Sequence, residues 1–563
     1  MSARTWFVAI SVWLWAIVAA AQVPTGSVSG RIADSDGGGI PGTTVTASSP
    51  NLQGARSVVS SEYGDYSLPL LPPGTYTLTF ELSGFRTQTR TVSVAPTQNV
   101  ALNVTLTVGG VSETVNVVAE SSPFVNTATV ASSFRQELMV TLPTNRTLSA
   151  AVIMAPNVHA TGPNNTNGSD GGIAIGGAMS FDSLFLLNGV AVTENVRGQP
   201  FTLFIEDAIQ ETTISTGGIS AEYGRFGGGL VNAITKSGGN LFSGSYRHSL
   251  NNDNWRALTP FTGDTKLDKV VPTYEYTLGG PLAKDRLWFF TAGRIQKQEQ
   301  ARQTIATVIP YTFVNDEKRY EGKLTYSPVS AHTVRGSFTK IVNALQNQSF
   351  GNPLDLRSLY TQKQPQDLLS LNYNGIVRGR MAVEAQYSQR NFAIVDAGSP
   401  YLDLEGGTLL IDRARGGTGF RYWAPTFCSC NDDQRNNTQF LMKGTYFTST
   451  DRYGAHTLVF GYDTYNDHRL ANNHQSGSDY RILGTSTIVR GTDVFPVFQG
   501  DGSTLIQWDP IAQESQATDL RVHSGFFNDT VRLGSRLTMN LGLRYDRNAA
   551  VDAAGAKVSD SSR

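Results

Sequence analysis

Short stretches in which apolar and polar residues alternate recur along almost the whole chain, and they restrict the fold more than any other feature. From residue 241 onward these stretches approach the roughly 9–11 residues of a tilted membrane strand. Glycine reaches 56 residues and charged residues make up only 16% of the chain, a balance that favours turn-rich β structure over helical folds. The sequence therefore predicts a mainly β protein.

The N-terminus has the three regions of a secretory signal. Arg4 is followed by a largely apolar run over residues 6–18 and then by Ala19, Ala20 and Ala21, which match the charged, hydrophobic and small-residue regions of such a signal. A membrane anchor is the weaker alternative, because the run is shorter than the roughly 20 residues of a spanning helix. We expect residues 1–21 to be removed on export.

Beyond the signal the sequence contains no window of 18 apolar residues. A mature chain that spans a membrane must then do so as a closed barrel, because only helices and closed barrels satisfy every backbone polar group in lipid. The 45 Lys and Arg nearly balance the 46 Asp and Glu, so no overall field attracts a polyanion. We expect no nucleic acid among the partners.

Residues 22–108 contain six short alternating runs bounded by Gly, Pro, Asp or Asn, which predicts a small antiparallel β-sandwich. Tyr66 and Phe85 are its aromatic core candidates. The domain resembles the carboxypeptidase regulatory-like, transthyretin-like family in segments 30–34 (GRIAD), 40–46 (IPGTTVT), 64–68 (GDYSL), 71–76 (LPPGTY) and 84–85 (GF). Relatives of this fold sometimes bind carbohydrate, so glycan binding is an alternative to a role as a periplasmic spacer or docking module.

Catalytic and metal-binding patterns are missing from the sequence. None of the seven histidines lies in a His-x-x-Glu or His-Glu-x-x-His arrangement, so we expect neither an enzyme nor a cofactor. The only cysteines are Cys428 and Cys430. Two thiols alone make a poor metal site, so we expect no metal here. The simplest interpretation is that the two cysteines brace their loop or have no special role.

Residues 109–120 are predicted to form a linker that contains a short β-prone strip. The strip consists of Glu113, Thr114, Val115, Asn116, Val117, Val118 and Ala119. Such a strip can add an edge strand to the sheet of a partner. In position and content it is similar to the TonB box of TonB-dependent receptors, which implies TonB as a partner. The last strand of the sandwich and the first strand of the next domain are the alternatives.

Residues 121–239 resemble the small α+β plug domain of these receptors. The matching motifs follow in order at 171–177 (GGIAIGG), 181–190 (FDSLFLLNGV), 209–214 (IQETTI) and 220–239 (SAEYGRFGGGLVNAITKSGG). Gly176 and Asn188 replace an Arg and an Asp that are common in relatives, so no gating charge is carried over to these positions. Glu222 and Arg225 are candidate plug–barrel contacts, because lumenal charges are costly without partners; solvated lumen residues are the alternative.

Residues 240–563 alternate in pairs of strands joined by short turns, with long polar connections between the pairs, which is typical of an outer-membrane barrel. A tight turn is expected at residues 279–286. Segments 523–530 and 537–546 resemble a hairpin of the Oar-like branch of the family. We count about eleven strands against about 22 in plugged transporters. We therefore expect the first half of a transmembrane barrel, in a C-terminally incomplete sequence that stops at Arg563 without an aromatic terminal strand.

The resemblances imply a TonB-dependent outer-membrane receptor of the Oar-like type. It would lie in outer-membrane lipid with its sandwich in the periplasm. It would take up an extracellular ligand, with energy from TonB and its inner-membrane complex; a carbohydrate, a peptide and a siderophore all fit this architecture. The alternative is an outer-membrane adhesion or sensing protein with a carbohydrate-binding-like sandwich and no active transport.

Overall fold

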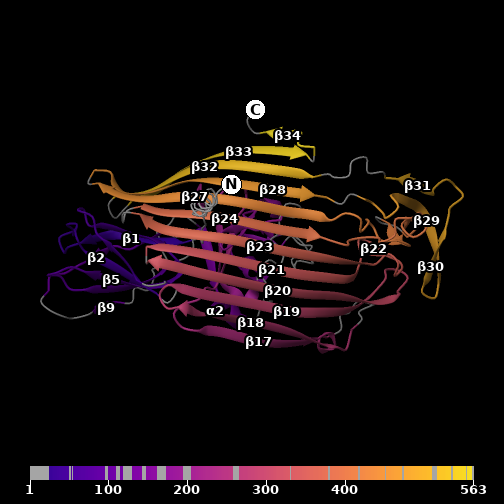
Figure 1. Cartoon of the computed structure of the whole chain (residues 1–563), viewed down its shortest axis with the longest axis horizontal. Coiled ribbons are helices and arrows are strands. Elements are labelled where there is room, and N and C mark those ends of the chain that lie inside the picture. The colour runs from indigo at the N-terminus through magenta and orange to yellow at the C-terminus, as the bar shows by residue number, and fades with distance from the viewer. Residues whose placement is uncertain are drawn as a thin grey trace, which may run out of the picture.

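The computed structural model consists almost entirely of β-sheets, arranged as a sandwich, a plug, a large barrel sheet and a smaller outer sheet (Figure 1). It describes residues 25–49, 52, 55–94, 99–109, 115–117, 130–142, 148–160, 173–194, 205–257, 266–329, 331–377, 381–415, 419–450, 452–471, 474–509, 517–533, 537–552 and 554–560. The predicted signal peptide, the strip residues Glu113, Thr114, Val118 and Ala119, and the loop over 161–169 lie outside these ranges. Among the described residues, no helix is long and apolar enough to cross a membrane.

The N-terminal domain is a sandwich of two sheets. The first contains β4 (Asp65–Leu71), β1 (Gly26–Ala33), β7 (Asn99–Ala101) and β8 (Val104–Thr105). The second runs in the order β3 (Arg56–Val59), β2 (Thr44–Ser48), β5 (Gly74–Glu81), β6 (Gln88–Val94) and β9 (Val115–Val117). The expected β-sandwich is present and most of its strand pairs are antiparallel, but β7 and β8 pair with β1 in parallel and β9 pairs with β6 in parallel. These strands arrive by crossovers, whereas only tight hairpins force antiparallel pairing.

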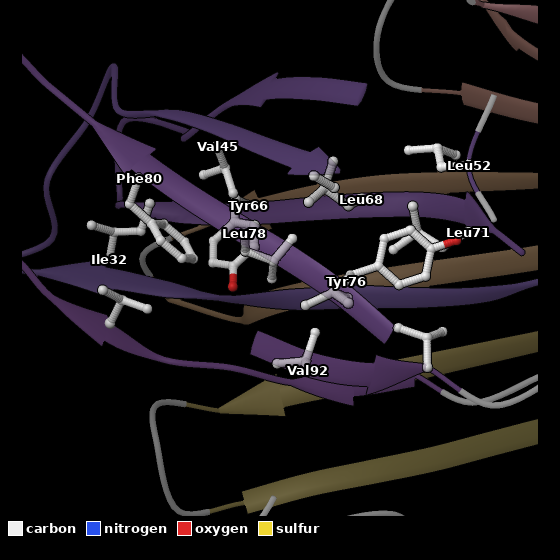
Figure 2. Close-up of a cluster of buried hydrophobic side chains, with 14 of the residues drawn as sticks. Ile32, Val45, Leu52, Tyr66, Leu68, Leu71, Tyr76, Leu78, Phe80 and Val92 are labelled. Atoms are coloured by element: carbon white, nitrogen blue, oxygen red, sulfur yellow. The ribbon is translucent and has the colours of Figure 1, made fainter. Parts of the chain in front are cut away.

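Aliphatic side chains and the rings of Tyr66, Tyr76 and Phe80 fill the core of the sandwich (Figure 2). Tyr66 meets Phe80 edge-on, with ring centroids 5.5 Å apart, and its hydroxyl donates to the carbonyl of Leu102 at 2.8 Å. Burial raises the pKa of Tyr66 well above its ordinary value, so the phenol stays neutral and can donate. Phe85, the second expected core aromatic, packs at the edge of the cluster and is only partly buried.

The plug is a five-stranded sheet accompanied by short helices. Its sheet runs in the order β10 (Val130–Arg135), β15 (Ile209–Gly217), β16 (Leu230–Thr235), β13 (Leu184–Leu187) and β14 (Val190–Ala191). A separate pair, β11 (Val158–Ala160) and β12 (Ile173–Ile175), and the helices α2 (Gln136–Thr141), α3 (Leu148–Ile153) and η3 (Glu206–Ala208) complete it. The plug core also includes Ile341 and Leu368. These two residues belong to the barrel, so the two domains share part of one core.

The barrel sheet contains twelve strands that follow one another in antiparallel order. They are β17 (Ser243–Asn252), β18 (Val270–Ala283), β19 (Leu287–Gln303), β20 (Pro310–Val329), β21 (His332–Gln348), β23 (Tyr360–Val377), β24 (Met381–Ile394), β27 (Asp433–Thr450), β28 (Gly454–Leu470), β32 (Thr518–Leu533), β33 (Leu537–Asp552) and β34 (Lys557–Asp560). Within the described residues the sheet has two ends, at β17 and β34. The sandwich lies at the end with the short turns, and the smaller outer sheet lies at the other (Figure 1).

The turn expected at residues 279–286 is shorter than predicted. Strand β18 continues to Ala283, so only residues 284–286 form the turn. Gly279 and Gly280 pair with Phe290 and Phe289 of β19. A Cβ on Gly280 would lie 2.3 Å from the ring of Phe242, so this glycine provides room for an aromatic ring rather than a bend.

The connections on the other side of the barrel fold into a sheet of their own, which we call the cap. It contains β22 (Asn352–Pro353), β26 (Phe420–Tyr422), β25 (Leu409–Asp412), β29 (Tyr480–Arg490), β30 (Asp493–Val497) and β31 (Leu505–Trp508). Ile309, Leu354, Leu410 and Val494 pack around Tyr422 in its core. The Tyr422 hydroxyl lies 2.7 Å from Thr485 Oγ1, and burial raises its pKa to about 12. The cap was not expected from the sequence.

Strand β20 shows that the barrel sheet is polar inside and apolar outside. Glu317, Glu321 and Lys323 point inward and are at most 6% exposed. Tyr320, Leu324 and Tyr326, which alternate with inward residues, are exposed on the opposite face. An apolar outer face with aromatic residues at its margins is the surface that a membrane barrel presents to lipid. The expectation of a transmembrane barrel sheet is confirmed by this arrangement and by the comparisons reported below.

This orientation predicts a depth-dependent cost for charge on the outer face. Leu324→Arg should destabilise the folded state by about 2–4 kcal/mol, because Leu324 lies inside the apolar band. Val329→Arg, next to the short turn at the end of β20, should cost about 0–1 kcal/mol. Urea titration of the chain refolded into lipid vesicles, read by heat-modifiable gel mobility, measures both. Equal costs at the two positions would contradict the assignment of this face to lipid.

Candidate functional site

The interface between the plug and the inner wall of the barrel gathers most of the buried charge. Alternation along the strands places the wall charges toward the lumen. The wall side chains that are at least nine-tenths buried include Glu275, Glu317, Arg319, Glu321, Lys323, Glu384, Arg435, Lys443 and Asp463. Charges that leave bulk water need partners. The plug supplies many of them.

Arg225 reaches from the plug to the wall. Its Nη1 donates to Asp463 Oδ2 of β28 at 2.7 Å, and its guanidinium lies 4.1 Å from the ring centroid of Tyr465. The same carboxylate oxygen accepts from Arg544 Nη2 at 3.2 Å. Asp463 therefore joins one cation of the plug to one of the wall.

Glu222 forms a second link. Its Oε2 accepts from Lys443 Nζ of β27 at 2.7 Å, and Lys443 also lies 3.4 Å from Glu384 Oε1. The backbone carbonyl of Glu222 accepts from Arg544 Nη1 at 2.9 Å. Both residues singled out from the sequence thus face charged wall residues.

Three further acidic residues of the plug contact the wall, and sequence reasoning missed them. Glu194, which is 0% exposed, accepts from Arg435 Nη1 at 2.6 Å. Asp207 Oδ2 accepts from Arg247 Nε at 3.0 Å. Glu206 pairs with both Arg294 and Arg319. No motif marks these acids, and their partners follow only from the three-dimensional register of the barrel strands.

The charge state of Glu206 follows from its surroundings. Burial alone raises the pKa of this carboxyl, but Arg319 and Arg294 beside it outweigh burial and lower the pKa below its ordinary value. Glu206 is therefore ionised at neutral pH. The plug presents a negative charge to two wall arginines at this point.

The two departures from the plug pattern have local backbone explanations. Asn188 and Gly189 join β13 to β14 with φ values of +51° and +82°, the two-residue turn that an Asn-Gly pair favours. The Asn188 side chain accepts from the Thr235 amide at 2.9 Å and donates to its hydroxyl at 3.0 Å, which a carboxylate cannot do. Gly176 and Gly177 have φ values of +66° and +78°, where an Arg would be strained.

The middle of the β-prone strip forms the edge strand of the sandwich. In β9, Val115, Asn116 and Val117 lie opposite Gln88, Thr89 and Arg90 of β6. This pairing is the arrangement that the alternative interpretation, a last sandwich strand, describes. Strand β9 is the terminal strand of its sheet, so its second edge has no strand partner within the described residues.

The sandwich contacts the barrel beside the short turns. The hydroxyl of Ser449, at the end of β27, donates to Asp65, and Arg532, near the end of β32, donates to Ser29. Thr25 Oγ1 lies 3.4 Å from Glu384 Oε2. The strip is thus held on the same side of the barrel as the turns.

On the cap side, the ends of β17, β19 and β20 surround a polar pocket of about 500 Å³. Its lining includes Asp253, Arg256, Gln300, Arg302 and Tyr311. Guanidinium, amide and phenol groups in one hollow offer several hydrogen bonds to a polar guest.

The plug–wall contacts predict that the plug loosens when Asp463 loses its charge. Asp463→Asn leaves Arg225 and Arg544 without their shared anion, and removal of one partner from a buried pair costs about 3–5 kcal/mol. Hydrogen exchange at β15 and β16 should accelerate by about 100-fold or more, since about 1.4 kcal/mol corresponds to a factor of ten.

Lys363→Gln is the matched control. It breaks the pair with Asp396, whose two side chains are 58% and 48% exposed. Such surface pairs contribute about 0–1 kcal/mol. Plug exchange that responds equally to both variants, or to neither, would contradict a holding role for Asp463.

Three family models match successive parts of the chain. They are a carboxypeptidase regulatory-like domain at residues 27–107, a TonB-dependent receptor plug domain at 124–231 and an outer membrane beta barrel domain at 234–315. A curated relative, the TonB-dependent transporter Oar of Myxococcus xanthus, is 26% identical. The match covers 91% of this chain and 56% of that protein, so the chain spans little more than half the length of this relative.

Solved structures show the same fold. The siderophore receptor PirA from Acinetobacter baumannii aligns with a TM-score of 0.52 and 18% identity, over 75% of this chain and 58% of that one. The outer membrane transporter YddB from Escherichia coli aligns with a TM-score of 0.54 and 14% identity, over 74% of this chain and 56% of that one. The expected mainly β fold, with a regulatory-like domain, a plug and a barrel, is confirmed.

Proposed function

This chain has the domain architecture of TonB-dependent outer-membrane receptors, and we propose that it takes up an extracellular ligand with energy supplied through TonB. Its location is the outer membrane. One observation carries the proposal: ion pairs join the plug to the barrel wall, among them Arg435–Glu194, which is almost fully buried, and Arg225–Asp463, in which the carboxylate is buried. A plug held in this way closes the lumen until work is done on it.

The order of the segments along the chain suggests how a pulling force could reach the plug. The strip over residues 113–119 precedes β10, the edge strand of the plug sheet. A partner strand added to the strip draws its affinity from backbone hydrogen bonds. A pull on the strip would therefore reach β10 first, and then the plug contacts with the wall. We place the sandwich and the strip in the periplasm, where TonB could engage them.

Charged contacts suit a plug that has to move and return. When the plug leaves, wall groups such as Asp463 and Lys443 face a water-filled lumen, and water replaces their lost partners. An apolar interface of the same size would instead expose apolar surface to water. We infer that Glu222 and Arg225 hold the plug closed at rest, together with Glu194 and Glu206.

The pocket beside the cap is consistent with a polar ligand. Arg256, Arg302 and Gln300 line it and can donate several hydrogen bonds to sugar hydroxyls, carboxylates or peptide carbonyls. We therefore favour an oligosaccharide or a peptide as the guest. No covalent chemistry is assigned to the site.

The alternative, adhesion or sensing without transport, places ligand binding in the sandwich. The sandwich lies on the turn side of the barrel, opposite the cap. A glycan outside the cell would meet the cap first. This position favours the transport proposal.

Coupling through the strip is tested with the C-terminal domain of TonB. Val115→Pro and Val117→Pro each remove a backbone donor, and we expect either change to reduce binding of the purified chain to this domain by at least tenfold. Val115→Ala and Val117→Ala keep the amide and are the matched controls. Unchanged binding by both proline variants would rule out the strip as the TonB contact.

The same variants separate transport from adhesion. Cells that produce the wild-type protein should accumulate compounds from a labelled oligosaccharide and peptide mixture, and a protonophore should stop the accumulation. The Val115→Pro variant should bind the mixture at the surface but accumulate none. Accumulation that is indifferent to the protonophore would favour adhesion or sensing.

A further inference from the structure

Three sulfur and nitrogen ligand atoms come together where two long connections of the cap meet. Cys428 and Cys430 belong to the connection between β24 and β27, and His474 belongs to the connection between β28 and β29. One ligand atom from each residue lies within 4.8 Å of the others. Two thiols alone make a poor metal site. The fold adds an imidazole to them.

The cysteine segment is fixed by its backbone. Cys428 forms a parallel bridge with Ser399. The Ser399 amide donates to the Phe427 carbonyl at 3.0 Å, and the Ser429 amide donates to the Ser399 carbonyl at 2.9 Å. Cys428 is fully buried whereas Cys430 is exposed. The two sulfurs therefore lie on a segment that is held by backbone hydrogen bonds, and solvent reaches the site from the side of Cys430.

The histidine segment packs against the same part of the cap. A Cβ on Gly477 would lie 2.0 Å from the Tyr401 carbonyl oxygen, so only glycine permits this approach. The Gly477 amide donates to the Gly407 carbonyl at 3.0 Å. His474 Nδ1 lies 2.6 Å from Asp479 Oδ1. A carboxylate on one ring nitrogen orients the other toward a metal, as in most histidine metal ligands.

We propose that reduced Cys428 and Cys430, together with His474, bind one soft or borderline cation, Cu(I) or Zn(II). Thiolate and imidazole are the ligands that these ions prefer, whereas Ca²⁺ and Mg²⁺ take oxygen ligands. Three protein ligands suffice for Cu(I), and Zn(II) completes its four with water. The bound ion fastens the two cap connections to each other.

Oxidation and metal binding are alternative states of the two sulfurs. In the structure Cys428 and Cys430 form a disulfide. A phosphine or thiol reductant supplies two electrons, and with two protons the disulfide becomes two thiols. Binding of the cation then releases these two protons, because the ligands are thiolates. The oxidised chain should therefore not take the metal at this site.

Metal titration of the full chain in detergent tests the proposal. The chain is reduced with a phosphine, freed of reductant without oxygen, and titrated with Zn(II) and separately with Cu(I) against a chromophoric chelator. We expect one equivalent per chain, with the tighter cation identified by the two competitions. Co(II) used as a probe should give thiolate-to-metal charge-transfer absorption. The oxidised chain, which is folded and unchanged in sequence, should show none of this.

Variants assign the ligands. Cys430→Ser should abolish binding of the metal ion. His474→Ala should weaken the affinity for the ion by at least tenfold, and Asp479→Asn should weaken it by about 10–100-fold. His468→Ala is the matched control, because His468 Nδ1 lies 2.6 Å from Asp519 Oδ1 in the same kind of pair without cysteines. No binding by the reduced chain, or binding that survives Cys430→Ser or is unaffected by His474→Ala, would overturn the proposal.

Discussion

A strand in lipid must make all its backbone hydrogen bonds within its own sheet, and the rest of this structure depends on that constraint. It fixes a continuous antiparallel sheet in which side chains alternate between lipid and lumen. In β20 the outward Leu324 is exposed, while the inward Glu321 and Lys323 are almost fully buried. The usual placement of polar and apolar residues is thereby reversed. The lumen becomes a charged surface, and whatever fills it has to satisfy those charges.

The plug meets this requirement from several positions along its chain. Arg225 shares Asp463 with Arg544, Glu222 lies beside Lys443, and Glu206 sits between two wall arginines. Buried pairs of this kind add little net stability over apolar packing, but they are costly to break one partner at a time. They therefore define one seated position of the plug, and water can replace them when the plug moves.

The sequence was informative wherever a local rule decides the structure. The alternating runs of the N-terminal domain follow from local patterns, and the structure has strands there. Local patterns do not determine which charges meet across the lumen, because these pairings depend on the register of strands hundreds of residues apart. Glu194 and its partner Arg435 were missed for that reason.

Two further features of the fold were not predicted from the sequence, and each has a specific cause. Gly279 and Gly280 looked like a turn, but they make room for aromatic rings within a strand pair. The cap was expected to be loop, because its strands are short and pair across several connections. Pulling on the strip of a single molecule in a bilayer, through an attached TonB domain, shows whether force on the strip unseats the plug. We expect the plug to leave in steps while the barrel stays folded, and to leave at a lower force in the Asp463→Asn variant. Detachment of the TonB domain without extension, or extraction of barrel strands before the plug, would contradict this expectation.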